Sequence, residues 1–206
     1  MNTEGGLAAL RQTINHICGG LEEDDWNAFE SVLQLQSLDA NVTVLQAGHS
    51  SGCFWFIASG LIRNAYLTED GKEFNKAFIP APGFCGAMSE WVTGQAARYS
   101  IHTMTPVYLV RVPMSWLRQA VQERPAFACL MATVLSELAW RKERREAAFL
   151  LDDATTRYQQ CIRELGDLAE HIPAYHLASY LGITEVAISR IKRRLREAGE
   201  FPFDSD

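Results

Sequence analysis

The pattern of apolar residues changes at Pro113, and this change limits the possible folds more than any other feature of the sequence. Before Pro113, short apolar or alternating runs lie at 42–45, 53–58, 61–67, 74–79 and 107–112. Turn residues separate them, including Asp70-Gly71, a pair that tolerates positive φ and favours a hairpin. Short strands at such near-regular spacing predict a small barrel or sandwich in the first half of the chain.

Helical patterns flank and follow these runs. We predict helices over 22–38 and 153–165, and a long helix opened by Pro125, because a proline in the first turn lacks only an amide that would be unpaired anyway. Four apolar residues of the long helix recur at steps of four, three and four: Phe127, Met131, Val134 and Leu138. This spacing favours a homodimer along the stripe, the alternative being a helix that only covers the sheets. The charged run 141–146 predicts a solvated end or hinge.

The last module has the spacing of a helix-turn-helix. Ala178 supplies a small residue where two helices cross, Gly182 lies at the turn, and Ile188 and Ile191 plug the gap between the helices. Thr184 is suited to cap the second helix. We predict that this helix enters the major groove of double-stranded DNA and reads bases with Glu185, Val186, Ser189 and Arg190. The residues expected at phosphates are Thr184, Lys192, Arg193, Arg194 and Arg196.

The charge distribution agrees with this interpretation. The net charge is −6, but the excess acid lies within residues 1–110, and residues 111–206 balance to zero. Segment 185–196 holds five basic residues and one acid, a local charge of +4 over about three helical turns. The alternative, a terminal amphipathic helix with a solvated basic face, explains the charge but not the glycine and aliphatic spacings.

Taken together, these motifs resemble the Crp/Fnr family of bacterial transcription regulators. The resemblance rests on Tyr180-Leu181-Gly182-Ile183-Thr184, on Ile188-Ser189-Arg190-Ile191, on Arg157-Tyr158 and on the glycines at 48, 60, 71, 83 and 86. It implies an α+β fold: a β-roll of the cyclic-nucleotide-binding type over 1–124, a dimerisation helix and hinge over 125–150, and a helix-turn-helix domain over 151–206. We expect little or no β-wing after Arg196, with Phe201 and Phe203 folding back on the module.

The effector pocket departs from the pattern of family members that bind cyclic AMP. Those members carry Gly-Glu-Leu and, about ten residues on, Arg-Ser or Arg-Thr; the glutamate holds the ribose and the arginine the phosphate. Here the candidate pocket residues are Gly86, Ala87, Met88, Arg98, Tyr99 and Ser100, without the glutamate and with the arginine displaced by one. Losing a charge-assisted bond lowers affinity more than tenfold. We therefore predict that cyclic AMP is not the effector, whose identity and existence stay open, as does haem binding.

Other functions find less support in the sequence. It shows no catalytic constellation, no phosphate-binding glycine loop and no clustered metal ligands, so neither an enzyme nor a metal cofactor is predicted. Five scattered cysteines, no membrane-spanning run and no export signal predict a cytoplasmic protein. The resemblance adds RNA polymerase and a small-molecule effector as partners. The alternative function is a small-molecule or partner-protein receptor whose DNA binding is weak or lost.

Overall fold

Two four-stranded antiparallel sheets form a β-roll in the computed structural model, which describes residues 3–199. The strand order is β1-β8-β3-β6 in one sheet and β2-β7-β4-β5 in the other. The strands are β1 (Gln34–Leu38), β2 (Thr43–Leu45), β3 (Cys53–Ser59), β4 (Leu61–Leu67), β5 (Glu73–Pro80), β6 (Gly83–Cys85), β7 (Ser100–Thr103) and β8 (Val107–Pro113). The five predicted strands are confirmed, and β4 and β5 form the expected hairpin around Gly71, whose φ is +82°.

Strands β3 and β8 are buried on both faces, which explains their nearly continuous apolar sequences. On one face, Ile57 and Leu109 pack inside the roll. On the other, Phe56 and Val110 pack in a core with residues of α1 (Thr3–Cys18), α2 (Glu23–Glu30), α4 (Met114–Glu123) and the long helix that begins at Pro125. A short helix, α3 (Met88–Thr93), follows β6.

The helix predicted over 22–38 is wrong in its second half. Helix α2 ends at Glu30, and residues Gln34–Leu38 form strand β1, which pairs with β8 from Gln34↔Arg111 to Leu38↔Val107. The apolar residues there fit either period, so pairing with a strand 69 to 77 residues away decides the conformation. Helix α1, which the sequence analysis did not predict, covers the same core with Leu10 and Ile14.

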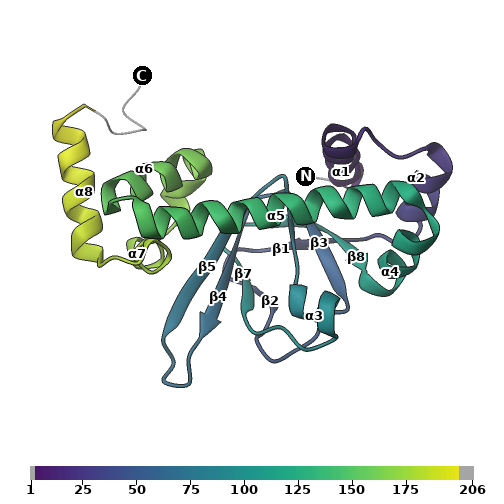
Figure 1. Ribbon diagram of the computed structural model, residues 1–206, viewed down its shortest axis with the longest axis horizontal. Coiled ribbons are helices and arrows are strands. Elements are labelled where there is room, and N and C mark those ends of the chain that lie inside the picture. Colours follow the sequence, from purple (N-terminus) through teal and green to yellow (C-terminus); the bar gives the residue numbers. More distant parts are fainter. Residues whose placement is uncertain (1–2, 200–206) are drawn as a thin grey trace.

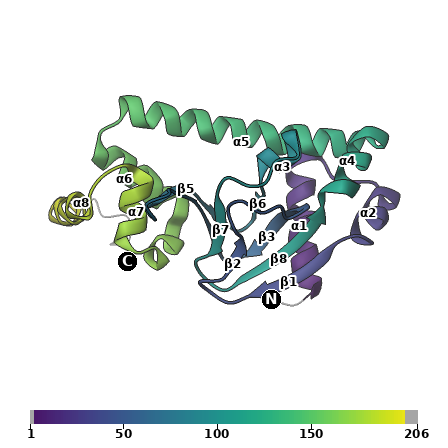
Figure 2. The same ribbon diagram turned by 90° about the horizontal axis from the view of Figure 1, so that it is seen from below.

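The long helix α5 (Pro125–Leu151) begins at Pro125, as predicted, and connects the roll to the last module (Figures 1 and 2). It runs through the charged segment 141–146 without a break, so the chain bends only at Asp152 and Asp153. The prediction that Phe127 and Met131 face a partner is wrong, because both are buried in the apolar core between the roll and helices α1, α2 and α4. Val134 packs at the edge of that core and Leu138 is half-buried.

The last module, called the head below, is helical. It contains α6 (Ala154–Leu165), the 3-10 helix η1 (Gly166–His171), α7 (Ala174–Leu181) and α8 (Glu185–Glu197). Asp153 caps α6 by accepting a hydrogen bond from the Thr156 amide at 2.8 Å. The predicted α+β class, with a β-roll and a C-terminal helix-turn-helix, is confirmed.

Two further predictions concern the ends of the chain and the membrane. Within residues 3–199 no strand follows α8, and Phe201 and Phe203 lie outside the described residues. In the same part of the chain, no helix combines the length and apolar character needed to cross a bilayer.

Candidate nucleic-acid interface

The turn between α7 and α8 is fixed by backbone and side-chain bonds. Gly182 ends α7 in the left-handed region at φ +68°, which glycine adopts without strain. The Ile183 amide then donates to the Ala178 carbonyl at 3.1 Å, and the Thr184 hydroxyl accepts from the Ala187 amide at 3.1 Å. These contacts set where α8 begins and at what angle it leaves the turn.

Burial fixes the rotation of α8 about its axis. Ile188, Ile191 and Leu195 lie in the core of the head, together with Leu177 and Leu181 of α7. The predicted base-reading residues, Glu185, Val186, Ser189 and Arg190, are all exposed. The inward stripe was readable from the sequence, because an α-helix brings residues three and four apart onto one face.

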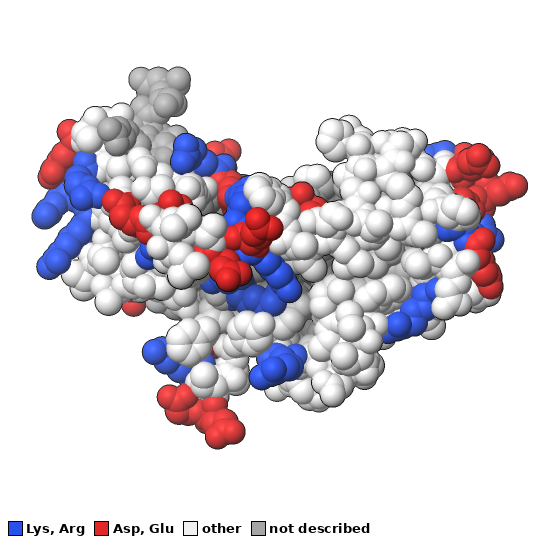
Figure 3. All heavy atoms as spheres, in the orientation of Figure 1, with Lys and Arg blue, Asp and Glu red and all other residues white. Residues whose placement is uncertain are grey.

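The basic side chains of α8 differ in their intramolecular contacts and in their exposure. Arg193 lies 3.8 Å from Glu197, an exposed pair of small energetic weight. Arg194 bends back to bond the Thr155 hydroxyl of α6, so its guanidinium is partly engaged within the head. Lys192 is half-buried, whereas Arg196 is exposed. Figure 3 shows basic side chains gathered at the end of the molecule where α8 lies.

The head docks on the roll through strand β5, and the contact is polar as well as apolar. The Asn75 amide donates to the Ser179 hydroxyl at 3.0 Å, and the Ser179 hydroxyl donates to the Glu73 carbonyl at 3.3 Å. Phe78 meets Tyr180 edge to face at 5.2 Å between ring centroids. Leu61 of β4 even joins the apolar core of the head. The roll therefore holds α7, and through it α8, in one orientation.

A buried network lies at the centre of this contact. Arg63, Asn75 and His176 are 6%, 3% and 7% exposed. Arg63 donates to Glu73 at 2.6 Å and to the Asn75 side-chain oxygen at 2.9 Å. The Asn75 side-chain nitrogen lies 2.9 Å from the His176 carbonyl and 3.1 Å from His176 Nδ1.

This network requires a neutral His176. Arg63 can only donate and a carbonyl can only accept, so the orientation of the Asn75 amide is determined, and Nδ1 of His176 must be an unprotonated acceptor. Burial, reinforced by the nearby Arg63 charge, lowers the pKa of His176 to about 4. The bond from Arg63 likewise lowers the pKa of Glu73.

Arg145 of α5 completes the docking contact. Its guanidinium donates to the carbonyls of Lys76 at 2.9 Å, Asn75 at 3.3 Å and Tyr180 at 3.1 Å. It also lies 4.5 Å from the centroid of the Tyr180 ring. One side chain thus connects α5, β5 and α7. Sequence analysis missed Arg63, Asn75, Arg145 and His176, because no motif marks residues that meet only when two domains pack.

The candidate effector pocket is partly filled by the chain itself. The Tyr99 hydroxyl donates to the Gly86 carbonyl at 2.6 Å, its ring meets Tyr66 edge to face, and Lys76 Nζ lies 4.5 Å from its centroid. Burial raises the pKa of Tyr99 and lowers that of Lys76 to about 8. The structure thus brings Gly86 and Tyr99 together, with Ala87 buried and Met88 half-buried beside them in the chain.

Of the other two polar side chains in the candidate pocket, one is exposed and the other is bonded to the backbone. Arg98 is exposed, and the Ser100 hydroxyl accepts from the Ala47 amide at 3.0 Å. Glu90, which the sequence analysis did not single out, is buried in α3. Its carboxylate accepts from the amides of Ser51 and Gly52, at 3.0 Å for Ser51, and so stabilises that turn. It therefore does not replace the missing ribose-binding glutamate.

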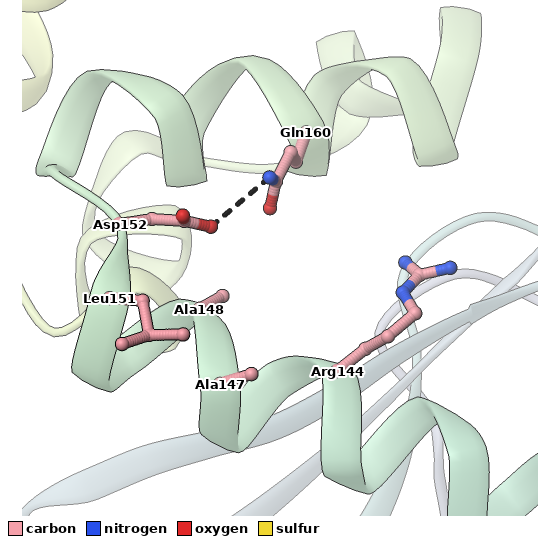
Figure 4. Close-up of a pocket in the computed structure, with 6 residues that line it drawn as sticks. All are labelled: Arg144, Ala147, Ala148, Leu151, Asp152 and Gln160. Atoms are coloured by element: carbon pink, nitrogen blue, oxygen red, sulfur yellow. Dashed lines mark hydrogen bonds between the residues drawn. The ribbon is translucent and has the colours of Figure 1, made fainter.

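A separate pocket of about 320 Å³ lies where α5 turns into α6 (Figure 4). Asp152 accepts from the Gln160 side chain at 3.1 Å across it. Arg144 extends from α5 toward α6 and pairs with Glu164. These bonds brace the bend at 152–153. Among residues 3–199, no three histidine, cysteine or carboxylate side chains converge as a metal site would require.

Comparison with known proteins agrees with this geometry. Residues 35–124 match the family described as cyclic nucleotide-binding domain. The global nitrogen regulator of Synechococcus elongatus is 24% identical over 81% of this chain and 80% of its own length. The nitrogen fixation regulation protein FixK of Azorhizobium caulinodans is 27% identical over 73% of this chain and 64% of its own.

Solved structures extend the similarity to the whole fold. The structure of FixK2 from Bradyrhizobium japonicum superposes with a TM-score of 0.73 at 18% identity, covering 85% of this chain and 90% of that one. The resemblance to Crp/Fnr-type regulators that the sequence predicts is confirmed.

Proposed function

Since the chain resembles Crp/Fnr-type regulators in both sequence and fold, we propose that it is a sequence-specific DNA-binding transcription regulator that acts as a homodimer. Its partners would be double-stranded DNA, a second copy of the chain and RNA polymerase. We assign it no catalytic activity and place it in the cytoplasm. The division into 1–124, 125–150 and 151–206 stays a prediction.

One observation carries the proposal: α8 presents an exposed, basic face while its opposite face anchors it in the head. A side chain in the major groove must be rigidly positioned and free of intramolecular partners to read base edges. Arg190 is exposed on that face, and arginine can bond two acceptors of guanine at once. Lys192, Arg193, Arg194 and Arg196 would hold phosphates.

The dimer contact would use a different face of α5 from the one expected. Phe127 and Met131 face the roll, but residues on the opposite side recur at steps of four and three and are exposed or half-buried: Cys129, Thr133, Ser136, Trp140, Glu143, Ala147 and Leu150. Steps of this kind keep one face of a helix along a partner helix. Trp140 is the large side chain near the middle of this outer stripe.

The roll would act on the heads through the docking contact with β5. Two heads related by twofold symmetry would read inverted half-sites one helical turn apart, about 34–36 Å. An effector, if the roll binds one, would shift the equilibrium between head orientations by changing β5 and its contacts with α7. Tyr99 in the candidate pocket argues against cyclic AMP as that effector.

The test starts from the purified protein without added nucleotide. Fragments of genomic DNA are selected at graded salt concentration, and the bound fragments are sequenced. A regulator that needs no ligand enriches a palindrome whose binding survives moderate salt. The Arg190→Ala variant is expected to bind the selected site about 1–3 kcal/mol more weakly, roughly 5- to 150-fold in Kd.

Arg11→Ala serves as the matched control. It removes the same charge from an exposed arginine of α1, at the opposite end of the molecule from α8 (Figure 1). Its Kd for the selected site should equal that of the unmodified protein. If binding to DNA is salt-labile and shows no sequence preference, both without effector and with each candidate effector added, the protein would instead be a receptor that has lost its DNA function.

A further inference from the structure

Val186 occupies an unusual position for an aliphatic residue. It is the second residue of α8 and is 60% exposed, whereas Ile188, Ile191 and Leu195 of the same helix are buried. A β-branched residue is also a weaker helix former than the lysine and arginine residues found elsewhere on the outer surface of α8. Neither folding of the head nor solubility therefore accounts for a valine here.

The direction of this side chain is set before any ligand binds. The Thr184 cap fixes the start of α8, and the three buried aliphatic residues fix its rotation. Valine has one strongly preferred χ1 rotamer in a helix, so its two methyl groups point in one direction. A preset apolar surface loses little conformational entropy when it is buried against a partner.

The neighbours of Val186 define what it would meet. Arg190 lies four residues on, and so on the same face of the helix. Ser189 lies between them, but its hydroxyl donates to the Glu185 carbonyl at 3.1 Å. Val186 and Arg190 are thus the adjoining positions of the exposed face, one apolar and one cationic, about 6 Å apart along the axis.

The major groove offers one apolar group on a base edge, the 5-methyl group of a pyrimidine. Valine neither donates nor accepts a hydrogen bond, so opposite a cytosine amino group or a purine acceptor it would bury a polar group without a partner. Opposite a methyl group it removes apolar surface from water on both sides. We propose that Val186 is a specificity-determining residue that reads the 5-methyl group of a pyrimidine, which is thymine in unmodified DNA.

The spacing along α8 limits where this thymine lies. Base pairs rise about 3.4 Å per step, so 6 Å along the helix corresponds to about two steps if α8 follows the groove. The thymine should therefore lie within about two base pairs of the guanine that Arg190 reads. This inference rests on the proposed function, because it requires that α8 enters the major groove.

Deoxyuridine separates the methyl group from base pairing, since it pairs like thymidine but lacks that group. In synthetic duplexes of the selected site, each thymidine is replaced singly with deoxyuridine, symmetrically in both half-sites, and Kd is measured by fluorescence anisotropy at one salt concentration. One position is expected to weaken binding about fourfold per half-site, close to 15-fold for the palindrome. In the Val186→Ala variant, the same replacement should change Kd less than twofold.

Methylated cytosine provides a second arm. At the sensitive position, 5-methylcytosine paired with guanine should bind more tightly than unmethylated cytosine, about fourfold per half-site, if the methyl group itself is read. Equal binding by the two would show that another feature of the thymine pair is recognised. Val92→Ala, which truncates a similarly exposed valine of α3, is the matched control and should keep the deoxyuridine sensitivity.

The outcomes separate this inference from the proposed function. If no palindrome is selected under any condition, both are wrong. If a palindrome is selected but no thymidine is sensitive to deoxyuridine, or the sensitivity persists in Val186→Ala, the protein remains a DNA-binding regulator and the role of Val186 is refuted. Thermal unfolding of both variants by circular dichroism checks that each keeps its fold.

Discussion

Removing the side chain of Asn75 should loosen the head from the roll. Asn75→Ala deletes the acceptor for Arg63 and the donor to both the carbonyl and Nδ1 of His176. Arg63 keeps Glu73 as a partner, but the buried Nδ1 of His176 is left without its donor and the His176 carbonyl loses one of its bonds. An unpaired buried group costs about 1–3 kcal/mol, so we expect the docked arrangement to lose about 3 kcal/mol.

Hydrogen exchange measures this change at the contact itself. The backbone amide at position 75 donates to Ser179, and we expect the amides of α7 to be protected from exchange while the head is docked. A loss of about 3 kcal/mol raises the population of the open form roughly 100-fold, and exchange in these segments should accelerate by a similar factor. Exchange in β3 and β8, inside the roll, should not change.

Asn27→Ala provides the matched control, because Asn27 is exposed on α2, far from the head. It should leave exchange in α7 and the unfolding free energy within about 0.5 kcal/mol of those of the unmodified protein. If Asn75→Ala behaves like Asn27→Ala, the buried network does not hold the head, and our account of the docking contact is refuted.

Three further outcomes are expected. The pKa of His176 is about 4 in the folded protein and 6.5 in the unfolded chain, so the free energy of unfolding is unaffected by this group above pH 6.5 and falls by as much as about 3 kcal/mol toward pH 4. Urea titrations that show no loss of stability between pH 6.5 and pH 4, or an equal loss in His176→Gln, would contradict this. Cyclic AMP at micromolar concentration should give no saturable heat in calorimetry, because Tyr99 occupies part of the candidate pocket, bonded to Gly86 and in contact with Tyr66. A clear isotherm would overturn that reasoning. Trp140→Glu should convert the proposed dimer to monomers in sedimentation equilibrium by placing a charge in the outer stripe of α5, and an unchanged dimer mass would place the dimer contact elsewhere.

Local pattern was sufficient for much of the helix-turn-helix. The cap at Thr184, the left-handed Gly182 and the inward stripe of α8 depend on residues within a few positions of one another, so the sequence predicts them well. The same holds for the β4–β5 hairpin, where Asp70-Gly71 sets the turn.

The face of α5 that meets the roll could not be predicted in this way. The long helix is apolar around much of its circumference, and an apolar stripe fits either a sheet or a second helix. The sequence therefore allowed Phe127 and Met131 to face a partner, while packing against α1 and α4 buries them and leaves the opposite face open.

By itself, the sequence determined five of the strands, the start of the long helix at Pro125, the basic helix of the helix-turn-helix and the absence of the ribose-binding glutamate, since each is a property of neighbouring residues. The tertiary structure alone decided that residues 34–38 form a strand, that Tyr99 occupies part of the candidate pocket and that Arg63, Asn75, Arg145 and His176 join the head to the roll. Those contacts join segments up to about 100 residues apart. They contribute to stability only once folding has brought the segments together, against the loss of chain entropy, so no local pattern in the sequence shows them.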